Sequence, residues 1–446
     1  MLDDLPDEIV VHKILISLPP KDVGHCRAVR RSWRDTTTTP EFTLAHHQRQ
    51  PSLPIIDGLP SRLLVFFKIV VHKILVSMRP KDVGRCRAVR RSWRDPTTTP
   101  EFTLGHHRHQ PSLPIVDRLP SRFVVLHGGS GDGAVSDQQL WAFHPNPTLS
   151  GPICLHASTD GLLVISHGCR FHIYSPAIRR HALLPQPEHT LPCNSILDLY
   201  RHGTTGEYRV LWSSTTGDET ALHVLTVGDN ESRSVRVTMP SSPSLEQAVL
   251  QGLPRDTHYT GAATDHPPVH HRGNLHSMRR HRGATDTADI ADIIVFDAQA
   301  ESFRLMHTPV KLAYLDKLLE MEGKLALYSI DHRLTAINVW VMQEYEAEIW
   351  AFMFRIDVSM MEASQQLYLT SYTKKKKPLE STVQYFTQMA VLNERELLIR
   401  FNEKHVLRCD VDGNFLGILN IGKFQSCMLL TQHRLQDSII PIPPHT

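Results

Sequence analysis

The first 125 residues of this sequence contain a tandem duplication. Residues 8–65 and 68–125 align without a gap at an offset of 60 positions, and most of the aligned positions are identical. The period is too long and the copy number too low for a solenoid, which stacks many short repeats. The chain must therefore fold two copies of one small structure, in addition to whatever the later residues form.

The first copy predicts two short helices. Apolar residues recur at the i, i+3, i+4, i+7 spacing of one helix face at Val11, Ile14, Leu15 and Leu18. The pair Pro19-Pro20 ends this helix, because the residue before a proline avoids the α region. A second helix follows, with apolar positions roughly on one side at Val23, Cys26, Val29 and Trp33. Gly24 lies inside it and costs on the order of 1 kcal/mol relative to alanine, so this helix needs packing contacts.

The two copies differ at the start of their first helix. In the first copy, Pro6 suits the first helical turn, and Asp7-Glu8 places negative charge at the positive end of the helix dipole. The second copy has Phe-Phe-Lys at residues 66–68, and the lysine opposes the dipole by roughly a few tenths of a kcal/mol. We therefore expect the second copy to keep the helical fold of the first copy but not its function.

The later residues predict a β domain. The glycine-rich run 128–133 predicts a flexible connector, and no strand-then-helix context makes it a phosphate-binding loop. Residues 253–290, rich in His, Arg, Thr and Gly, predict a long loop. Short runs of Val, Ile and aromatic residues with turn residues between them favour a sandwich, a barrel or a propeller. These runs are Leu162–Ser166, Tyr208–Trp212, Leu222–Val227, Ile293–Phe296, Leu325–Tyr328, Val339–Met342, Ile349–Phe354 and Leu397–Phe401.

Composition and cysteine usage indicate a soluble protein of a reducing compartment. The chain is 41% hydrophobic and 21% charged, as in ordinary globular proteins. The seven cysteines are scattered, form no C-x-x-C pair and follow no signal peptide, which predicts free thiols. No apolar run approaches the roughly 18–20 residues that a membrane-spanning helix needs. We expect no membrane partner.

Charge is spread unevenly along the chain. Residues 1–127 carry 20 Lys and Arg against 12 Asp and Glu, whereas the remaining residues carry 28 against 34. The basic N-terminal part either has a partner of its own or presents solvated helix surfaces, and both interpretations remain open. The arginines between residues 27 and 34 share a helix with Trp33, so packing with solvation is a simpler account than nucleic-acid binding. We expect no nucleic-acid partner.

No pattern in the sequence predicts catalysis, a cofactor or a metal. The 28 histidines include several pairs, but none has convincing ligand spacing. Cys154, His156, His167 and Cys169 would approach one another on adjacent strands, yet ordinary core or surface positions explain them more simply. The sequence has no nucleophile elbow, kinase signature or zincin helix. We therefore expect a non-catalytic protein without metal or cofactor.

The first 42 residues resemble an F-box. The resemblance rests on Leu5–Ile9, Ile14-Leu15, Leu18-Pro19, Lys21–Val23, Cys26–Val29, Ser32–Arg34 and Pro40–Phe42 in that order and spacing. It implies a three-helix module that packs on the Skp adaptor of a cullin-type ubiquitin ligase, with Trp33 as an anchor near the module's end. The residues that it assigns to adaptor binding or to the module's small core are Leu5, Pro6, Ile9, Ile14, Leu15, Leu18, Pro19, Val23 and Trp33.

Residues from about 155 to 360 resemble the C-terminal domain of plant F-box proteins, the F-box-associated domain, which is propeller-like. The segments that carry this resemblance include Asp160–Leu163, Ile173–Ala177, Gly206–Val210, Ile294–Asp297, Glu320–Leu327 and Val339–Met342. They are looser than the F-box pattern and mostly structural. The resemblance implies a β domain whose loops bind a protein target.

We therefore expect an α+β multidomain chain, with small all-α modules followed by a mostly antiparallel, propeller-like β domain. Its expected parts are an F-box over 1–45, a degenerate second copy over 66–125, a linker over 126–150 and an F-box-associated β domain over 151–430. The implied function is the substrate-recruiting subunit of an Skp–cullin–F-box ubiquitin ligase in the cytoplasm or the nucleus. The alternative is a β-propeller enzyme or carbohydrate-binding protein with a vestigial N-terminal module.

Overall fold

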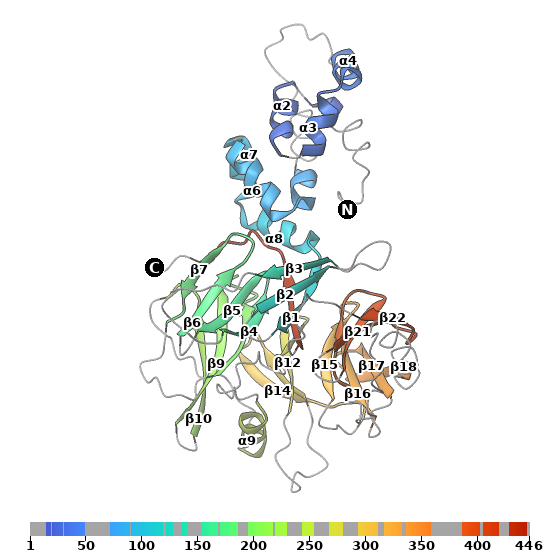
Figure 1. Ribbon diagram of the computed structural model, residues 1–446. Helices are drawn as coiled ribbons and strands as arrows, with labels where there is room; N and C mark the ends of the chain where they lie inside the picture. Colours follow the sequence, from blue (N-terminus) through green and yellow to red (C-terminus); the bar gives the residue numbers. More distant parts are fainter. Residues whose placement is uncertain are drawn as a thin grey trace. The chain divides into compact units, whose positions relative to one another are not determined.

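The computed structural model divides into a helical unit and a β unit (Figure 1). The helical unit comprises residues 1–112 with 175–179 and 436–441, and the β unit comprises the other residues. The structure describes residues 15–18, 20–29, 31–49, 72–89, 91–118, 122–127, 136–140, 153–167, 170–185, 195–216, 219–229, 243–253, 267–279, 293–310, 316–331, 336–357, 386–401, 405–418 and 428–443.

Both sequence copies form the same series of short helices. The first copy contains η2 (Leu15–Ser17), α2 (Pro20–Val29), α3 (Arg31–Thr37) and α4 (Pro40–Arg49). The second contains a helical turn over residues 72–77, then α6 (Pro80–Val89), α7 (Arg91–Thr97) and α8 (Pro100–His109). The predicted helix starts, residues 1–14 and 66–71, lie outside the described residues.

Matching hydrogen bonds hold the two copies in the same local structure. Arg27 donates to the Thr37 hydroxyl at 3.1 Å and to its carbonyl at 2.6 Å. Sixty positions later, Arg87 donates to the hydroxyl of Thr97 at 3.0 Å and to its carbonyl. The imidazole of His46 likewise lies 2.7 Å from the Leu18 carbonyl, as that of His106 does from the Met78 carbonyl. The substitutions between the copies therefore leave these contacts intact.

One apolar core joins the two copies. The helices α2 and α6 pack together, and burial with Cys26 nearby raises the pKa of the Cys86 thiol to about 12. The buried members of this shared core are Leu15, Ile16, Leu18, Val23, Cys26, Trp33 and Phe42 from the first copy, Leu75, Val76, Val83, Cys86 and Phe102 from the second, and Ile439. Because neither copy buries this set alone, the two copies fold as one unit.

The β unit contains six sheets among its described residues, and every pairing with a defined register is antiparallel (Figure 1). In strand order, blade A is β23 (Met428–Gln436), β1 (Ser112–Arg118), β2 (Arg122–His127) and β3 (Ser136–Leu140). Blade B is β4 (Ile153–Thr159), β5 (Leu162–His167), β6 (Arg170–Ser175) and β7 (Arg180–Leu183), and blade C is β8 (Ser195–Arg201), β9 (Tyr208–Thr216) and β10 (Glu219–Thr226).

The other three blades have four strands each. Blade D is β11 (Val269–His271), β12 (Asn274–Met278), β13 (Ile293–Asp297) and β14 (Ser302–Met306). Blade E is β15 (Lys317–Met321), β16 (Lys324–Ile330), β17 (Ala336–Glu344) and β18 (Ile349–Asp357). Blade F is β19 (Phe386–Val391), β20 (Glu396–Phe401), β21 (His405–Asp410) and β22 (Phe415–Ile418). One helix, α9 (Pro243–Gly252), packs between blades C and D through Val249.

Packing between neighbouring blades closes a ring. Buried clusters contain residues of both neighbours at five boundaries: Ile115 and Leu155 (A to B), Leu211 and Ile294 (C to D), Val295 and Leu325 (D to E), Val339 and Leu397 (E to F), and Leu398 and Val124 (F to A). At the sixth boundary, from B to C, strand β4 contacts β8. A closed ring of small antiparallel sheets is a β-propeller. The predicted propeller-like domain is confirmed, and its blade number is six.

The boundary between the helical copies and the propeller differs from the sequence prediction. The second copy was expected to extend to residue 125 and a linker to cover 126–150, but β1, β2 and β3 lie in this region and belong to blade A. The reason is burial: Ile115, Val116 and Val124 are 0% exposed in the blade's core. The glycine-rich run 128–133, which was expected to be a connector, lies outside the described residues, between the ends of β2 and β3 in the sequence. The C-terminal strand β23 also extends the domain beyond residue 430.

Tight turns gather at one edge of the ring. Asp160-Gly161, Arg272-Gly273 and Glu322-Gly323 each connect the first two strands of a blade, with φ between +51° and +79° at all six residues. Two positive φ values in a two-residue hairpin define a type I′ turn. The turns between third and fourth strands, such as 298–301 and 345–348, lie at the same edge. We call this surface the turn face.

The sequence predicted a long loop over residues 253–290, and this prediction is wrong for the part around the turn Arg272-Gly273. The structure has β11 and β12 within it, connected by Arg272-Gly273. The composition is rich in polar residues, but His276 and Leu275 alternate across a buried strand and are 0% and 2% exposed. A buried histidine with hydrogen-bond partners can therefore take a core position that a hydrophobicity pattern does not reveal.

Buried histidines predict that the propeller loses stability in acid. Burial lowers the pKa of His172 and of His276 to about 4, and that of His433 to about 3. The unfolded chain binds these protons near pH 6.5, so stability falls as the pH decreases from about 6.5 towards 4. For fully buried His276 the loss at about pH 5.5 is on the order of 1 kcal/mol. Urea unfolding at about pH 7.5 and about pH 5.5 measures this dependence.

The variant His276→Gln should show a smaller loss of stability between the two pH values than the unaltered chain. The variant His202→Gln, at a turn of blade C, is the matched control and should keep the full pH dependence. Equal unfolding midpoints at both pH values in the unaltered chain would contradict the buried neutral state of these histidines.

Candidate functional site

The residues predicted to bind an adaptor fall into two groups. Leu5, Pro6, Ile9, Ile14 and Pro19 lie outside the described residues. Leu15, Leu18, Val23 and Trp33 are buried, between 2% and 9% exposed, in the core that the two copies share. For these four the structure shows a role in the core of the helical unit, and their contact with an adaptor stays a prediction.

Leu44 is an apolar residue of the helical unit that sequence analysis did not single out. It lies on α4 and is 60% exposed, although Phe42 and His46 on the same helix are 1% and 9% exposed. Among the described residues of the helical unit, it is the large hydrophobic side chain that stays exposed. Leu44 is two residues from Phe42 and two from His46, so it lies on the opposite side of α4 from these buried residues.

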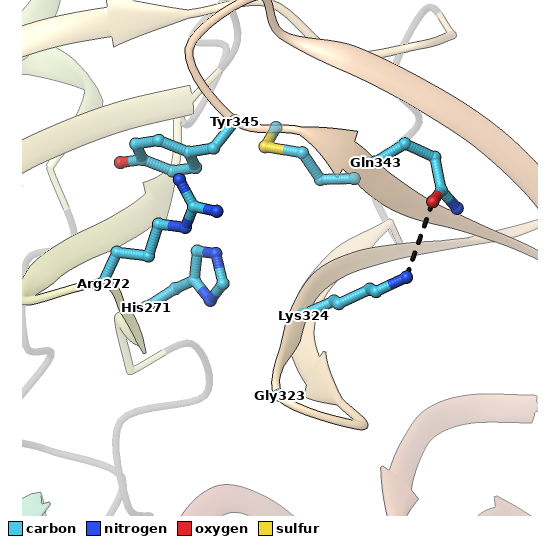
Figure 2. Close-up of a pocket in the computed structure, with 7 residues that line it drawn as sticks. His271, Arg272, Gly323, Lys324, Gln343 and Tyr345 are labelled. Carbon is cyan, nitrogen blue, oxygen red and sulfur yellow. Dashed lines mark hydrogen bonds between the residues drawn. The ribbon is translucent and has the colours of Figure 1, made fainter.

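A pocket of about 220 Å³ lies on the turn face, where blades D and E meet. It is lined by His271, Arg272, Gly323, Lys324, Met342, Gln343 and Tyr345. Figure 2 shows Arg272, His271 and Tyr345 on one side of the pocket and Lys324 with Gln343 on the other. Three turns from two blades therefore supply its walls: 272–273, 322–323 and 345–348.

The ring of Tyr345 is fixed by hydrogen bonds across the blade boundary. Its hydroxyl accepts from the Asn274 amide at 2.9 Å and lies 2.8 Å from His276 Nε2. His276 Nδ1 lies 3.1 Å from the Val269 carbonyl, which assigns the proton to Nδ1 and makes Nε2 the acceptor of the tyrosine proton. Burial lowers the pKa of His276 to about 4, so this neutral form holds at neutral pH.

Cations surround the Tyr345 ring. The guanidinium carbons of Arg272 and Arg304 each lie 5.3 Å from its centroid, within cation–π range. Arg304 also pairs with Glu348 at 3.5 Å. Lys324 Nζ lies 3.5 Å from Gln343 Oε1, and within the described part of the chain no carboxylate lies in ion-pair distance of Lys324 or Arg272. The pocket therefore presents positive charge beside an aromatic face.

The inner strands carry a second group of polar side chains. His270 Nε2 lies 2.7 Å from the buried Asp198 carboxylate, which joins β11 to β8. Burial raises the pKa of Asp198. Burial lowers the pKa of His270, but the Asp198 carboxylate raises it by more, so the net shift of the His270 pKa is upward. Thr159 donates to the Leu199 carbonyl at 2.6 Å and lies 3.4 Å from His270 Nε2. These contacts hold three blades together at the inner strands.

Within the group Cys154, His156, His167 and Cys169, the structure gives a partner for His156. His156 Nε2 lies 2.7 Å from the Ser166 hydroxyl, and Cys169 lies outside the described residues. Among the residues that the structure describes, no three His, Cys, Asp or Glu side chains are arranged to hold a metal ion. The helices described here include none that is long and apolar enough to cross a membrane.

Comparison with protein families gives two matches. An F-box domain model matches residues 2–44, and a model of the F-box associated beta propeller domain matches residues 134–392, more than half of the chain. The ring requires more residues than the second match covers, because β1, β2 and β20–β23 lie outside it. A protein of Arabidopsis thaliana that is named as an F-box protein is 21% identical over 338 residues, which are 75% of this chain and 68% of that protein.

Solved structures resemble the chain only distantly. TolB from Acinetobacter baumannii is 10% identical with a TM-score of 0.35, over 69% of this chain and 62% of that chain, less than two thirds of its length. YCF48 bound to D1 peptide is 8% identical with a TM-score of 0.31, over 68% of this chain and 81% of that chain. Similarity at this level supports no argument about function.

Proposed function

The chain belongs to the family of F-box proteins that carry an F-box associated β-propeller domain, and we propose that it recruits a protein target to a cullin-type ubiquitin ligase. The observation that carries this proposal is the order of the two matches in one chain, an F-box at residues 2–44 and a propeller domain at 134–392. A small docking module joined to a large closed domain suits a protein that holds two other proteins together. Since fold alone does not fix function, each binding surface needs its own support.

In this proposal the helical unit binds a Skp-type adaptor and, through it, a cullin. The predicted contacts Leu5, Pro6, Ile9, Ile14 and Pro19 precede or flank the described helices, and they remain part of the proposal. The exposed Leu44 on α4 adds a surface contact, because a leucine that is 60% exposed gains free energy when a partner covers it. The buried Leu15, Leu18, Val23 and Trp33 then act mainly by holding the helices in place.

The propeller binds the target protein through its turn face. This surface is formed by short turns on a closed ring, and such turns present side chains in fixed positions on a rigid scaffold. The pocket beside Tyr345 is lined by two cations, an aromatic ring and an amide, which are binding groups. We further propose that the chain is a non-catalytic subunit and that it acts in the cytoplasm or the nucleus.

The variant Leu44→Asp should weaken adaptor binding without unfolding the helical unit. Leu44 is exposed, so a charge there has no folding cost of the kind that a buried charge has. At an interface the same charge is desolvated, and we expect at least about a tenfold loss of affinity. Titration of purified adaptor by isothermal calorimetry measures it.

The matched control is Leu416→Asp in β22 of the propeller, where the leucine is 45% exposed. It should bind the adaptor with unchanged affinity. Leu15→Asp is not an equivalent test, since Leu15 is 2% exposed in the shared core and its loss of binding would reflect unfolding. Unchanged affinity for Leu44→Asp and for Leu5→Asp would overturn the proposed adaptor surface.

One adaptor should bind per chain, although the sequence contains two copies. The second copy lacks the proline and acidic residues of the first at its helix start, with Phe-Phe-Lys at 66–68. Its helix α6 also packs on α2 in the shared core, so part of its surface is covered within the chain. Native mass spectrometry of the complex counts the adaptors, and a species with two adaptors would show that the second copy is a working docking module.

A further inference from the structure

We propose that the pocket beside Tyr345 binds one anionic side chain, a carboxylate or a phosphate group, on an exposed segment of the target protein. This inference rests on the proposed function, because it assigns the chemistry of the target to one place on the turn face. Three features of the pocket carry it: its charge, its rigidity and its size.

The charge of the pocket has one sign. Arg272 and Lys324 line it, and no described carboxylate neutralises either of them at ion-pair distance. The acidic residues of the surrounding turns, Glu322, Glu344 and Glu346, are exposed and do not line the pocket. Two cations that face one cavity repel each other, and an anion placed between them removes this repulsion and gains charge-assisted hydrogen bonds.

The turn that carries Arg272 places this residue at the edge of the pocket. Its φ is +52°, a conformation that is uncommon for residues other than glycine, asparagine and aspartate. Arg272 lies in the type I′ turn of β11–β12, and its guanidinium carbon lies 5.3 Å from the centroid of the Tyr345 ring. Figure 2 shows this guanidinium next to the ring, across the pocket from Lys324. Arg272 is exposed, so its guanidinium is open to a ligand while it stays in cation–π contact with the ring.

The Tyr345 ring is a rigid part of the pocket lining. Its hydroxyl is used by Asn274 and His276, so the ring cannot turn away, and the side chain is 5% exposed. Burial and the neighbouring Arg272 lower the pKa of His271, so His271 is a neutral hydrogen-bonding group at neutral pH. Gln343 adds an amide on the side of Lys324. These groups suit an oxyanion with several acceptor oxygens.

The size of the pocket restricts the ligand. Its volume of about 220 Å³ is below the roughly 300–1,000 Å³ of pockets that hold drug-sized ligands. It therefore accommodates one side chain, and the rest of the target lies across the turn face. Glutamate, aspartate and a phosphorylated serine share the required chemistry.

The test uses the full chain with its methionine methyl groups labelled with ¹³C. Met342 lines the pocket, whereas Met353 lies on β18 outside the pocket lining and is 43% exposed. Three versions of one short neutral peptide are titrated, with serine, glutamate or phosphoserine at the central position. The Met342 methyl resonance should shift with the glutamate peptide, the phosphoserine peptide or both, and not with the serine peptide, while that of Met353 stays unchanged.

The variants distinguish the effect of the two positive charges from the effect of the turn conformation. Arg272→Asn removes the charge but tolerates a positive φ, and Lys324→Gln removes the second charge. Each substitution should lower the affinity for the anionic peptide about tenfold or more. Glu322→Gln, at the equivalent turn position of blade E with φ +52°, is the matched control and should bind the peptide at least as well as the unaltered chain.

The outcomes decide between the two levels of the account. No Met342 shift with either anionic peptide at millimolar concentration, an equal shift with the serine peptide, or unchanged binding by both Arg272→Asn and Lys324→Gln overturns the inference. If the chain binds the adaptor but the pocket does not bind the anionic peptides, only the inference about the pocket fails. If the pocket binds anions but the adaptor does not bind the chain, the proposed function fails and the pocket's chemistry stands.

Discussion

The structure depends on the pairing of β23 with β1, which closes the ring. The two strands are separated by some three hundred residues of sequence, yet they are neighbours in blade A, and the Thr431 hydroxyl donates to the Ile115 carbonyl at 2.5 Å. Leu430 packs towards blade F and Leu435 towards blade B. The last strand thus fills both interfaces of its blade. An open series of six small sheets would leave one apolar face of each terminal blade in water, and closure buries both faces.

Closure also explains why turns of the ring carry polar residues that reach across to the next blade. Glu301, in the third turn of blade D, accepts from Tyr200 at 2.8 Å and from Arg209 at 2.5 Å, both in blade C. Asp160 in blade B accepts from Tyr208 in blade C at 2.8 Å. Tyr345 in blade E bonds to Asn274 and His276 in blade D. Hydrogen bonds between neighbouring blades therefore make the turn face rigid. The pocket lies at one of these blade boundaries, between blades D and E, where Arg272 and Lys324 have no carboxylate partner among the described residues.

The sequence predicts the local structure well and the long-range structure poorly. The duplication and the helix pattern predict α2 and its partners, and each of the predicted β runs overlaps a strand. Blade A could not be predicted, because β23 is recognisable as its member only after the ring forms. The pocket could not be predicted either: residues 271–272, 323–324 and 342–345 meet only where two blades pack, and Arg272 lies in a segment whose composition indicates a loop. Burial of Leu15 and Trp33 in a core shared by both copies likewise depends on contacts 60 residues apart.

Hydrogen exchange of the double variant Leu430→Asp/Leu435→Asp tests the closed ring most directly. The two charges would be buried without partners at both interfaces of β23, while residues 436–441 of the helical unit remain in the chain. The account predicts faster exchange in β19–β20 and in β4–β5, on both sides of blade A, as well as in β1 and β2. Leu416→Asp at the exposed edge of blade F should leave the exchange of these strands unchanged. Faster exchange confined to β23 and its neighbour β1, with blades B and F fully protected, would contradict the claim that this strand holds the propeller closed.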